Sequence, residues 1–104
     1  MRKHTRSTHT IRATILLWPG AMAAWRFLPI PKKETKIIRE KYGANARGFG
    51  SLPVTATINK VSWQTSIFYD SRSESYLLPL KAIIRRKAGI EEGDTVACSL
   101  EIRV

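Results

Sequence analysis

The chain has few of the side chains on which catalysis and metal binding usually depend. It contains one cysteine, Cys98, and two histidines, His4 and His9, both near the N-terminus. A zinc site needs clustered cysteine, histidine or carboxylate ligands, and a serine or cysteine nucleophile needs a base within hydrogen-bonding reach. Residues 1–9 are predicted to form a disordered basic tail, so neither histidine is expected to act as that base. We therefore expect no metal or cofactor and no conventional hydrolase or redox enzyme.

Other absences narrow the class of protein further. A single cysteine excludes an internal disulfide and indicates a reducing, cytoplasmic compartment. No apolar run approaches the roughly 20 residues that a membrane span needs, and no membrane partner is expected. Residues 1–23 share some features of a secretion signal, but Pro19 and Gly20 interrupt the apolar segment.

Acidic residues are scarce relative to basic ones. The chain has 18 lysines and arginines against 8 aspartates and glutamates, a formal charge of +10, and its first acid is Glu34. Such a charge attracts polyanions, including nucleic acids and phosphorylated molecules. A solubilising surface together with a basic tail explains the same charge, so both interpretations stay open.

Apolar residues alternate with polar ones in several segments, which is the pattern of half-buried strands. The alternation predicts strands at residues 10–18, 25–28, 52–58, 63–69, 76–78 and 96–102.

Two segments have helical spacing instead. Residues 32–42 place Ile37, Ile38 and Tyr42 on one face, and Gly43 is the predicted left-handed stop. The second helix has a predicted buried stripe and ends at a glycine: Leu80, Ile83, Ile84, Ala88 and then Gly89.

The helices belong to an internal repeat. Residues 37–43 match residues 83–89 at five of seven positions, and each copy follows a Leu-Pro pair. The predicted order is β-β-α-β twice, and two short helices cannot cover an open six-stranded sheet. We therefore predict one mainly β domain at residues 10–104, a six-stranded double-split β-barrel with pseudo-twofold symmetry.

The second half of the chain carries family-like motifs. Its unit from Leu78-Pro79 through Gly89-Ile90 to Val96 is similar to the swapped-hairpin domains of AbrB-type and MazE-type regulators. Two such units in one chain resemble the domain-of-unknown-function family nineteen-oh-five, together with three further segments: Trp25–Phe27, Trp63–Ser66 and Tyr76–Lys81. The resemblance covers residues 10–104 and implies a double-split barrel but no established activity. In place of the family's usual glycine-containing turn, this chain has residues 59–62.

Candidate site residues come from the second half. Lys81 and Arg85 lie four residues apart on one helical face, which suggests a site for phosphate or carboxylate. Compensation of the helix dipole alone explains much of the basic cluster that includes Arg86 and Lys87, but Lys81 lies too far toward the N-terminus to benefit from it. The candidate ligand-binding set is Trp63, Thr65, Ser66, Tyr76, Lys81 and Arg85, and the structural set is Pro79, Gly89, Gly93 and Asp94.

These residues lead to a ranked set of functions. The first is a non-enzymatic binding module, monomeric or weakly dimeric, that takes a small anionic ligand or a protein segment at the barrel mouth. The alternative is a nucleic-acid-binding regulator of AbrB-like type, which the net charge favours. Glu40 in the first repeat replaces Arg86 of the second, so the two faces are not equivalent as a symmetric DNA reader requires. A small-molecule enzyme ranks third.

Overall fold

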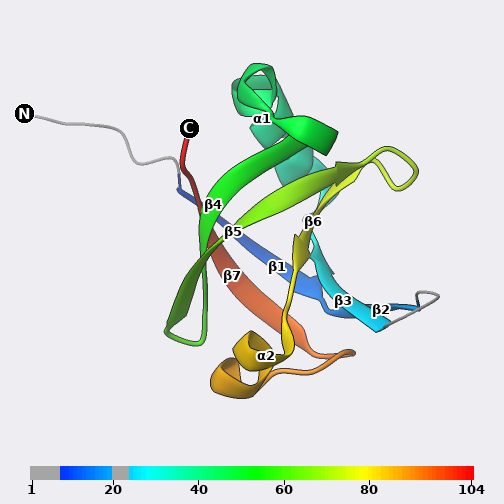
Figure 1. Cartoon of the computed structure of the whole chain (residues 1–104), viewed down its shortest axis with the longest axis vertical. Helices are drawn as coiled ribbons and strands as arrows, with labels where there is room; N and C mark the ends of the chain where they lie inside the picture. The colour runs from blue at the N-terminus through cyan, green and yellow to red at the C-terminus, as the bar shows by residue number, and fades with distance from the viewer. Residues whose placement is uncertain (1–7, 20–23) are drawn as a thin grey trace, which may run out of the picture.

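Antiparallel strands dominate the protein (Figure 1). The computed structural model describes residues 8–19 and 24–104. Its strands are β1 (Thr8–Thr14), β2 (Leu16–Pro19), β3 (Ala24–Pro29), β4 (Ser51–Ile58), β5 (Val61–Asp70), β6 (Ser75–Pro79) and β7 (Thr95–Ile102). Its helices are α1 (Lys32–Tyr42) and α2 (Ala82–Ala88), with single 3₁₀ turns η1 (Gly43–Asn45) and η2 (Gly48–Gly50). Mainly β structure with two helices is what the sequence predicted.

The core is built by the alternation seen in the sequence. In β4 every second side chain is buried, and β7 repeats the pattern from Val96 to Ile102. Successive side chains of a strand point to opposite faces of the sheet, so each of these strands gives one apolar face to the core. Together with residues of β1, β5, β6 and α1, they form one continuous cluster.

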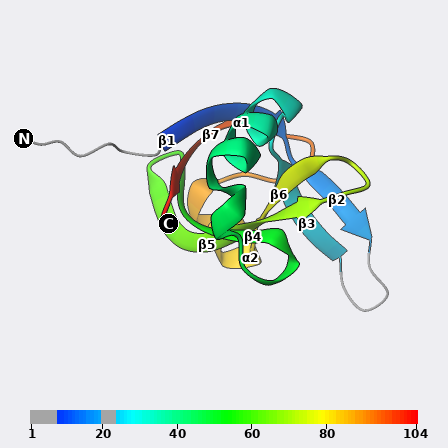
Figure 2. The same ribbon diagram turned by 90° about the horizontal axis from the view of Figure 1, so that it is seen from above.

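The sheet curls until its two ends meet in one stretch of chain (Figure 2). Its strand order is β1-β7-β4-β5-β6-β3-β2, and only Ile15 separates β1 from β2. The Ile15 N–H donates to Asp94 O at 2.9 Å, and its carbonyl accepts from Gly93 N at 2.9 Å. Ile15 thus interrupts the long first strand that the sequence predicted, which gives seven strands in place of six. The finer double-split topology stays a prediction.

The strands pair in a regular scheme between the two halves of the chain. The first half runs from β1 to β4, with β1 and β2 counted as one strand, and the second half runs from β5 to β7. The first strand of each half pairs with the last strand of the other half, β1 with β7 and β5 with β4. The second strands pair with each other, β3 with β6, as do the last strands, β4 with β7. This scheme is compatible with the predicted twofold relation, which a superposition of the two halves would measure.

Helix α1 packs on the core through Thr35, Ile38 and Tyr42. The sequence placed Ile37 on the same face, but 43% of Ile37 is exposed. The prediction for Gly43 was also wrong: its φ of −59° is right-handed, and the chain continues directly into η1. A left-handed stop is not needed where the backbone tightens into a 3₁₀ turn.

Helix α2 lies at the opposite end of the molecule from α1 (Figure 1). It buries Ile84, whereas Ile83, which the sequence also placed in the buried stripe, is 50% exposed. Gly89 ends the helix in the left-handed conformation, with φ of +69°, as predicted. The next residue, Ile90, is buried and donates its N–H to Arg85 O at 3.0 Å. No helix among the described residues is long and apolar enough to cross a membrane.

The hairpin between β4 and β5 has a two-residue turn. Asn59 and Lys60 have φ of 50° and 68°, and positive φ at both positions is the type I′ geometry that suits twisted strands. Asparagine tolerates this conformation, whereas Lys60 adopts it without being a glycine or an asparagine. The Asn59 side chain also donates to Ala88 O at 2.9 Å, which ties the turn to the end of α2.

Candidate functional site

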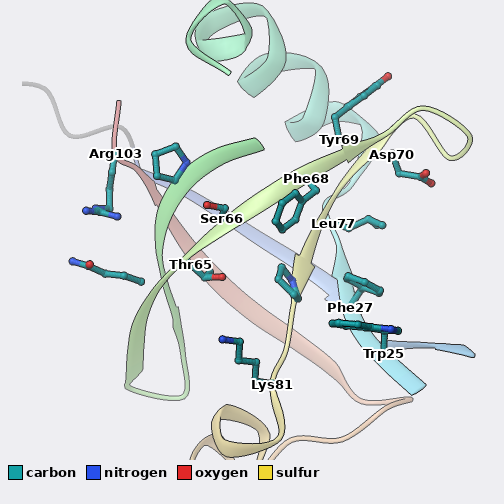
Figure 3. A pocket seen from close by; sticks show the side chains of 13 residues that line it. Trp25, Phe27, Thr65, Ser66, Phe68, Tyr69, Asp70, Leu77, Lys81 and Arg103 are labelled. Carbon is teal, nitrogen blue, oxygen red and sulfur yellow. The ribbon is translucent and has the colours of Figure 1, made fainter. Parts of the chain in front are cut away.

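An open groove of about 910 Å³ lies on the outer surface of the sheet (Figure 3). We call it the outer groove. It is lined by Trp25, Phe27, Pro53, Gln64, Thr65, Ser66, Phe68, Tyr69, Asp70, Leu77, Pro79, Lys81 and Arg103. These residues come from β3, β4, β5 and β6 and from the positions that follow β6 and β7.

Strand alternation turns most of these side chains away from the core. Ile67 is fully buried, and the next residue, Phe68, is 39% exposed. In β6, Tyr76 and Leu78 are buried while Leu77 between them is only partly buried. The outer groove therefore lies on the outside of the curled sheet, not at a mouth that opens into its core.

The groove has an aromatic wall that faces solvent. Trp25 is 57% exposed, and its ring stacks on that of Phe27 with centroids 6.3 Å apart and planes 19° apart. Phe68 and Leu77 face each other across the β5–β6 pair. Adjoining apolar side chains left open to water commonly mark an interaction surface.

Two cations and one hydrogen-bonded carboxylate line the groove as well. Lys81 and Arg103 form no ion pair with any described residue. Asp70 accepts hydrogen bonds from the hydroxyl of Ser73 at 2.7 Å and from its N–H at 3.1 Å. The hydrogen bond from the Ser73 hydroxyl is the main reason why the pKa of Asp70 lies below its ordinary value. The groove therefore combines an apolar wall with cations that are available to an anionic group.

The predicted ligand-binding residues divide between this groove and other surroundings. Thr65, Ser66 and Lys81 line the groove. Trp63 pairs with the buried Ala56 and packs against the core. Tyr76 is 1% exposed, and burial raises the pKa of its hydroxyl. The candidate set thus mixed residues of both sheet faces, and the structure does not bring all of them together.

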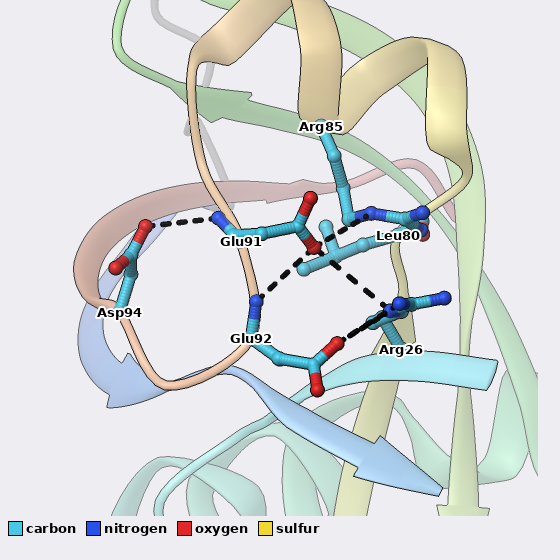
Figure 4. A network of polar contacts seen from close by, with 6 residues as sticks. All are labelled: Arg26, Leu80, Arg85, Glu91, Glu92 and Asp94. Carbon is cyan, nitrogen blue, oxygen red and sulfur yellow. Dashed lines mark hydrogen bonds and ion pairs between the residues drawn. The ribbon is translucent and has the colours of Figure 1, made fainter. Parts of the chain in front are cut away.

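Arg85, the remaining candidate, belongs to a network of ion pairs (Figure 4). Its Nη1 donates to Leu80 O at 2.7 Å, and its Nε lies 3.5 Å from Glu91 Oε1. Nearby, Arg26 donates through Nε to Glu92 Oε1 at 2.9 Å. Both arginines are therefore engaged in joining α2 and β3 to the turn before β7.

That turn contains two of the predicted structural residues. Asp94 Oδ2 accepts from Glu91 N at 2.9 Å, which is the local bonding expected of an aspartate in a turn. Gly93 has φ of +89°, where only glycine is unstrained.

Lys81 and Arg85 do share a smaller concavity of about 380 Å³. The aromatic residue that lines it is Trp25, whereas the predicted ligand-binding set contained Trp63. Because Trp25 and Lys81 also line the outer groove, the two concavities adjoin.

Groups with catalytic potential lie elsewhere. His9 is part of β1, which begins two residues before the predicted domain boundary, and its ring meets Tyr42 edge-on with centroids 6.0 Å apart. Burial lowers the pKa of His9, and the nearby positive charge of Lys41 lowers it further. Burial also raises the pKa of Cys98 to about 12. No cluster of three or more potential metal ligands occurs among the described residues.

Sequence reasoning missed Phe27, Phe68, Leu77 and Arg103 as site residues. A signal was present for Phe68, because it occupies an outward position next to the inward Ile67. A large apolar side chain on the solvent face of a predicted strand departs from binary patterning. Such departures mark either a partner element or a binding surface.

Fold and site together define a small, mainly β protein with a curled antiparallel sheet, two short helices and an open aromatic groove on the outer face. The chain belongs to the family described as Domain of unknown function (DUF1905), whose family model matches residues 12–100. No curated protein matches the chain.

Proposed function

We propose that this protein is a non-enzymatic binding module whose outer groove takes an apolar segment of a partner protein that also carries acidic residues. The observation that carries the proposal is the exposed aromatic wall beside two cations, Lys81 and Arg103, that form no ion pair within residues 8–19 and 24–104. Aromatic side chains supply much of the binding energy of protein interfaces. The neighbouring cations would select carboxylates and orient the segment.

The shape of the groove favours a protein segment over a small anionic ligand. Small-molecule sites bury most of the ligand surface in a cleft, whereas this groove is wide open along one face of the sheet. Arg85, which was expected to help bind a small anion, is already paired with Glu91. An extended segment can cover the apolar wall without needing enclosure.

The proposal is tested by selecting binders from a display library of random nonapeptides on the wild-type protein. The comparison protein is the double variant Trp25→Ala/Phe68→Ala, whose altered side chains are exposed and contribute little to folding. We expect peptides that combine apolar and acidic residues, with affinity for the double variant at least about tenfold weaker. Ile37→Ala, which removes an exposed apolar side chain from α1, is the matched control and should bind normally. Failure to select any peptide, or equal binding by the double variant, would overturn the proposal.

Nucleic-acid binding is the second candidate because of the charge of +10. Lys32, Lys36 and Arg39 line a further concavity of about 510 Å³ beside α1, together with two acidic residues, Glu40 and Glu74. Deletion of residues 1–7, which precede β1, separates this surface from the basic leader. Retained affinity for a 20-nucleotide DNA, falling steeply with salt as counterions are released, would support the candidate. Affinity that disappears with the deletion would assign binding to the leader.

A further inference from the structure

One edge of β5 is open along most of its length. β5 pairs with β4 from Val61 to Phe68, but β6 joins its other side only from Phe68 to Asp70. Figure 1 shows β6 diverging from β5 beyond this short contact. Residues 61–67 therefore have a strand neighbour on one side only.

The register shows which backbone groups face the open edge. Arg103 N donates to Pro53 O at 2.9 Å, so the backbone of Pro53 is directed toward the β7 side of β4. The N–H and C=O groups of successive residues in an antiparallel strand point alternately to its two sides. Those of Val54 therefore point toward β5, where Val54 pairs with Thr65. The residues that alternate with Thr65 are directed to the open edge: Ser62, Gln64 and Ser66.

These backbone groups are available for bonding. Within the part of the chain that the structure describes, no hydrogen bond to the backbone N–H or C=O of Ser62, Gln64 or Ser66 is found. Proteins often protect open edges with lysine, proline or a covering loop. None of these three residues is itself charged or a proline. Helix α2 contacts β5, and its Ala88 O accepts a hydrogen bond from Asn59 just before the strand begins.

The open edge runs beside the outer groove. Gln64 and Ser66 line the groove, with Pro79 and Lys81 also on its surface (Figure 3). Alternate side chains of an added strand point to opposite faces. A strand placed on this edge would therefore direct every second side chain toward the apolar wall of the groove.

We propose that the partner segment binds as an extra strand on β5, with its backbone bonded to Ser62, Gln64 and Ser66. This inference rests on the proposed function and specifies its mode of binding, in which main-chain bonds supply affinity and side-chain contacts supply specificity. Charge decides the occupant: a second copy would bring together two chains of formal charge +10, whereas an acid-bearing segment is attracted.

A pair of variants at one position tests the role of the β5 backbone. Gln64→Pro removes the side chain and the open-edge N–H, while Gln64→Ala removes the side chain alone. The N–H of Gln64 is not used in the ladder with β4, so Gln64→Pro should keep the fold, as circular dichroism would verify. We expect the tightest nonapeptide from the library to bind Gln64→Pro at least about tenfold more weakly than Gln64→Ala. Equal affinity of the two folded variants overturns strand addition.

Two methylated versions of that nonapeptide test the same bond from the other side and do not depend on the folding of a variant. One carries N-methyl groups on its odd-numbered amides and the other on its even-numbered amides. An added strand directs only alternate amides at β5, so one version should lose binding and the other should keep most of it. Equal effects of the two versions overturn strand addition while groove binding stands. If the parent nonapeptide binds Trp25→Ala/Phe68→Ala with the same affinity as it binds the wild type, the outer groove is not the binding site. A wild-type dimer that Gln64→Pro abolishes and Gln64→Ala retains would assign the edge to a second copy and overturn the inference.

Discussion

Two adjacent isoleucines of α1 offer a controlled measurement of what burial contributes to stability. Ile38 is fully buried, and its neighbour Ile37 is 43% exposed. Replacing either by alanine removes the same atoms from the same helix and improves intrinsic helix propensity by a few tenths of a kcal/mol at most. Any large difference between the two variants therefore reports the surroundings of the side chain.

The expected difference follows from the cost of a cavity. Ile38→Ala should lower the free energy of unfolding by roughly 2–5 kcal/mol, because it removes apolar contacts and leaves a void. Ile37→Ala should change it by less than about 0.5 kcal/mol, as is usual for a surface substitution.

Urea unfolding at 25 °C measures both variants beside the wild type. For a domain of this size, each kcal/mol also shifts the melting temperature by about 4–8 °C, so Ile38→Ala should melt at least about 8 °C lower. Equal costs for the two variants, or a larger cost at Ile37, would refute the assignment of the buried face of α1.

Three further outcomes are expected. Ile84→Ala should destabilise the protein by roughly 2 kcal/mol or more in urea melts, and Ile83→Ala by less than about 0.5 kcal/mol; similar costs would contradict the burial of Ile84 alone. Cys98, with its pKa raised to about 12 by burial, should resist alkylation by iodoacetamide at pH 8 and react fully in urea, as mass spectrometry would record; rapid labelling of the folded protein would contradict its burial. His9 has a lowered pKa, so the unfolded chain binds its proton more readily, and the stability it contributes above its ordinary pKa of about 6.5 is lost as pH falls below that value. His9→Gln should therefore lose less stability than the wild type between pH 8 and pH 5 in urea melts, and an equal loss would show that His9 does not contribute.

The strands could be predicted because their alternation is unambiguous. Residues 52–58 and 96–102 were expected as strands, and β4 and β7 each begin one residue earlier and end where expected. In the helices, Ile37-Ile38 and Ile83-Ile84 each place two isoleucines about 100° apart around the helix axis, and each helix buries only one of the two. Periodicity alone could not decide which residue of each pair packs inward.

The outer groove could not be predicted because long-range pairing creates it. Leu28 of β3 pairs with Leu78 of β6, fifty positions away, and this pairing brings Trp25 and Phe27 beside Leu77. Nothing local to Trp25 indicates which strand will lie next to it. The separation of Trp63 from Ser66 has a different, local cause: they lie three positions apart on β5, and strand alternation places them on opposite faces of the sheet.

The pairing of β1 with β7 also constrains how the chain can fold during its synthesis. Thr8 is opposite Glu101, so β1 leaves the ribosome long before its partner strand exists. The hairpin of β4 and β5, joined by only Asn59 and Lys60, needs no such wait. Local contacts form before distant ones because closing a long loop costs more entropy. The nascent chain therefore exposes β1 until translation reaches β7, and this interval is when a chaperone would have the most to protect.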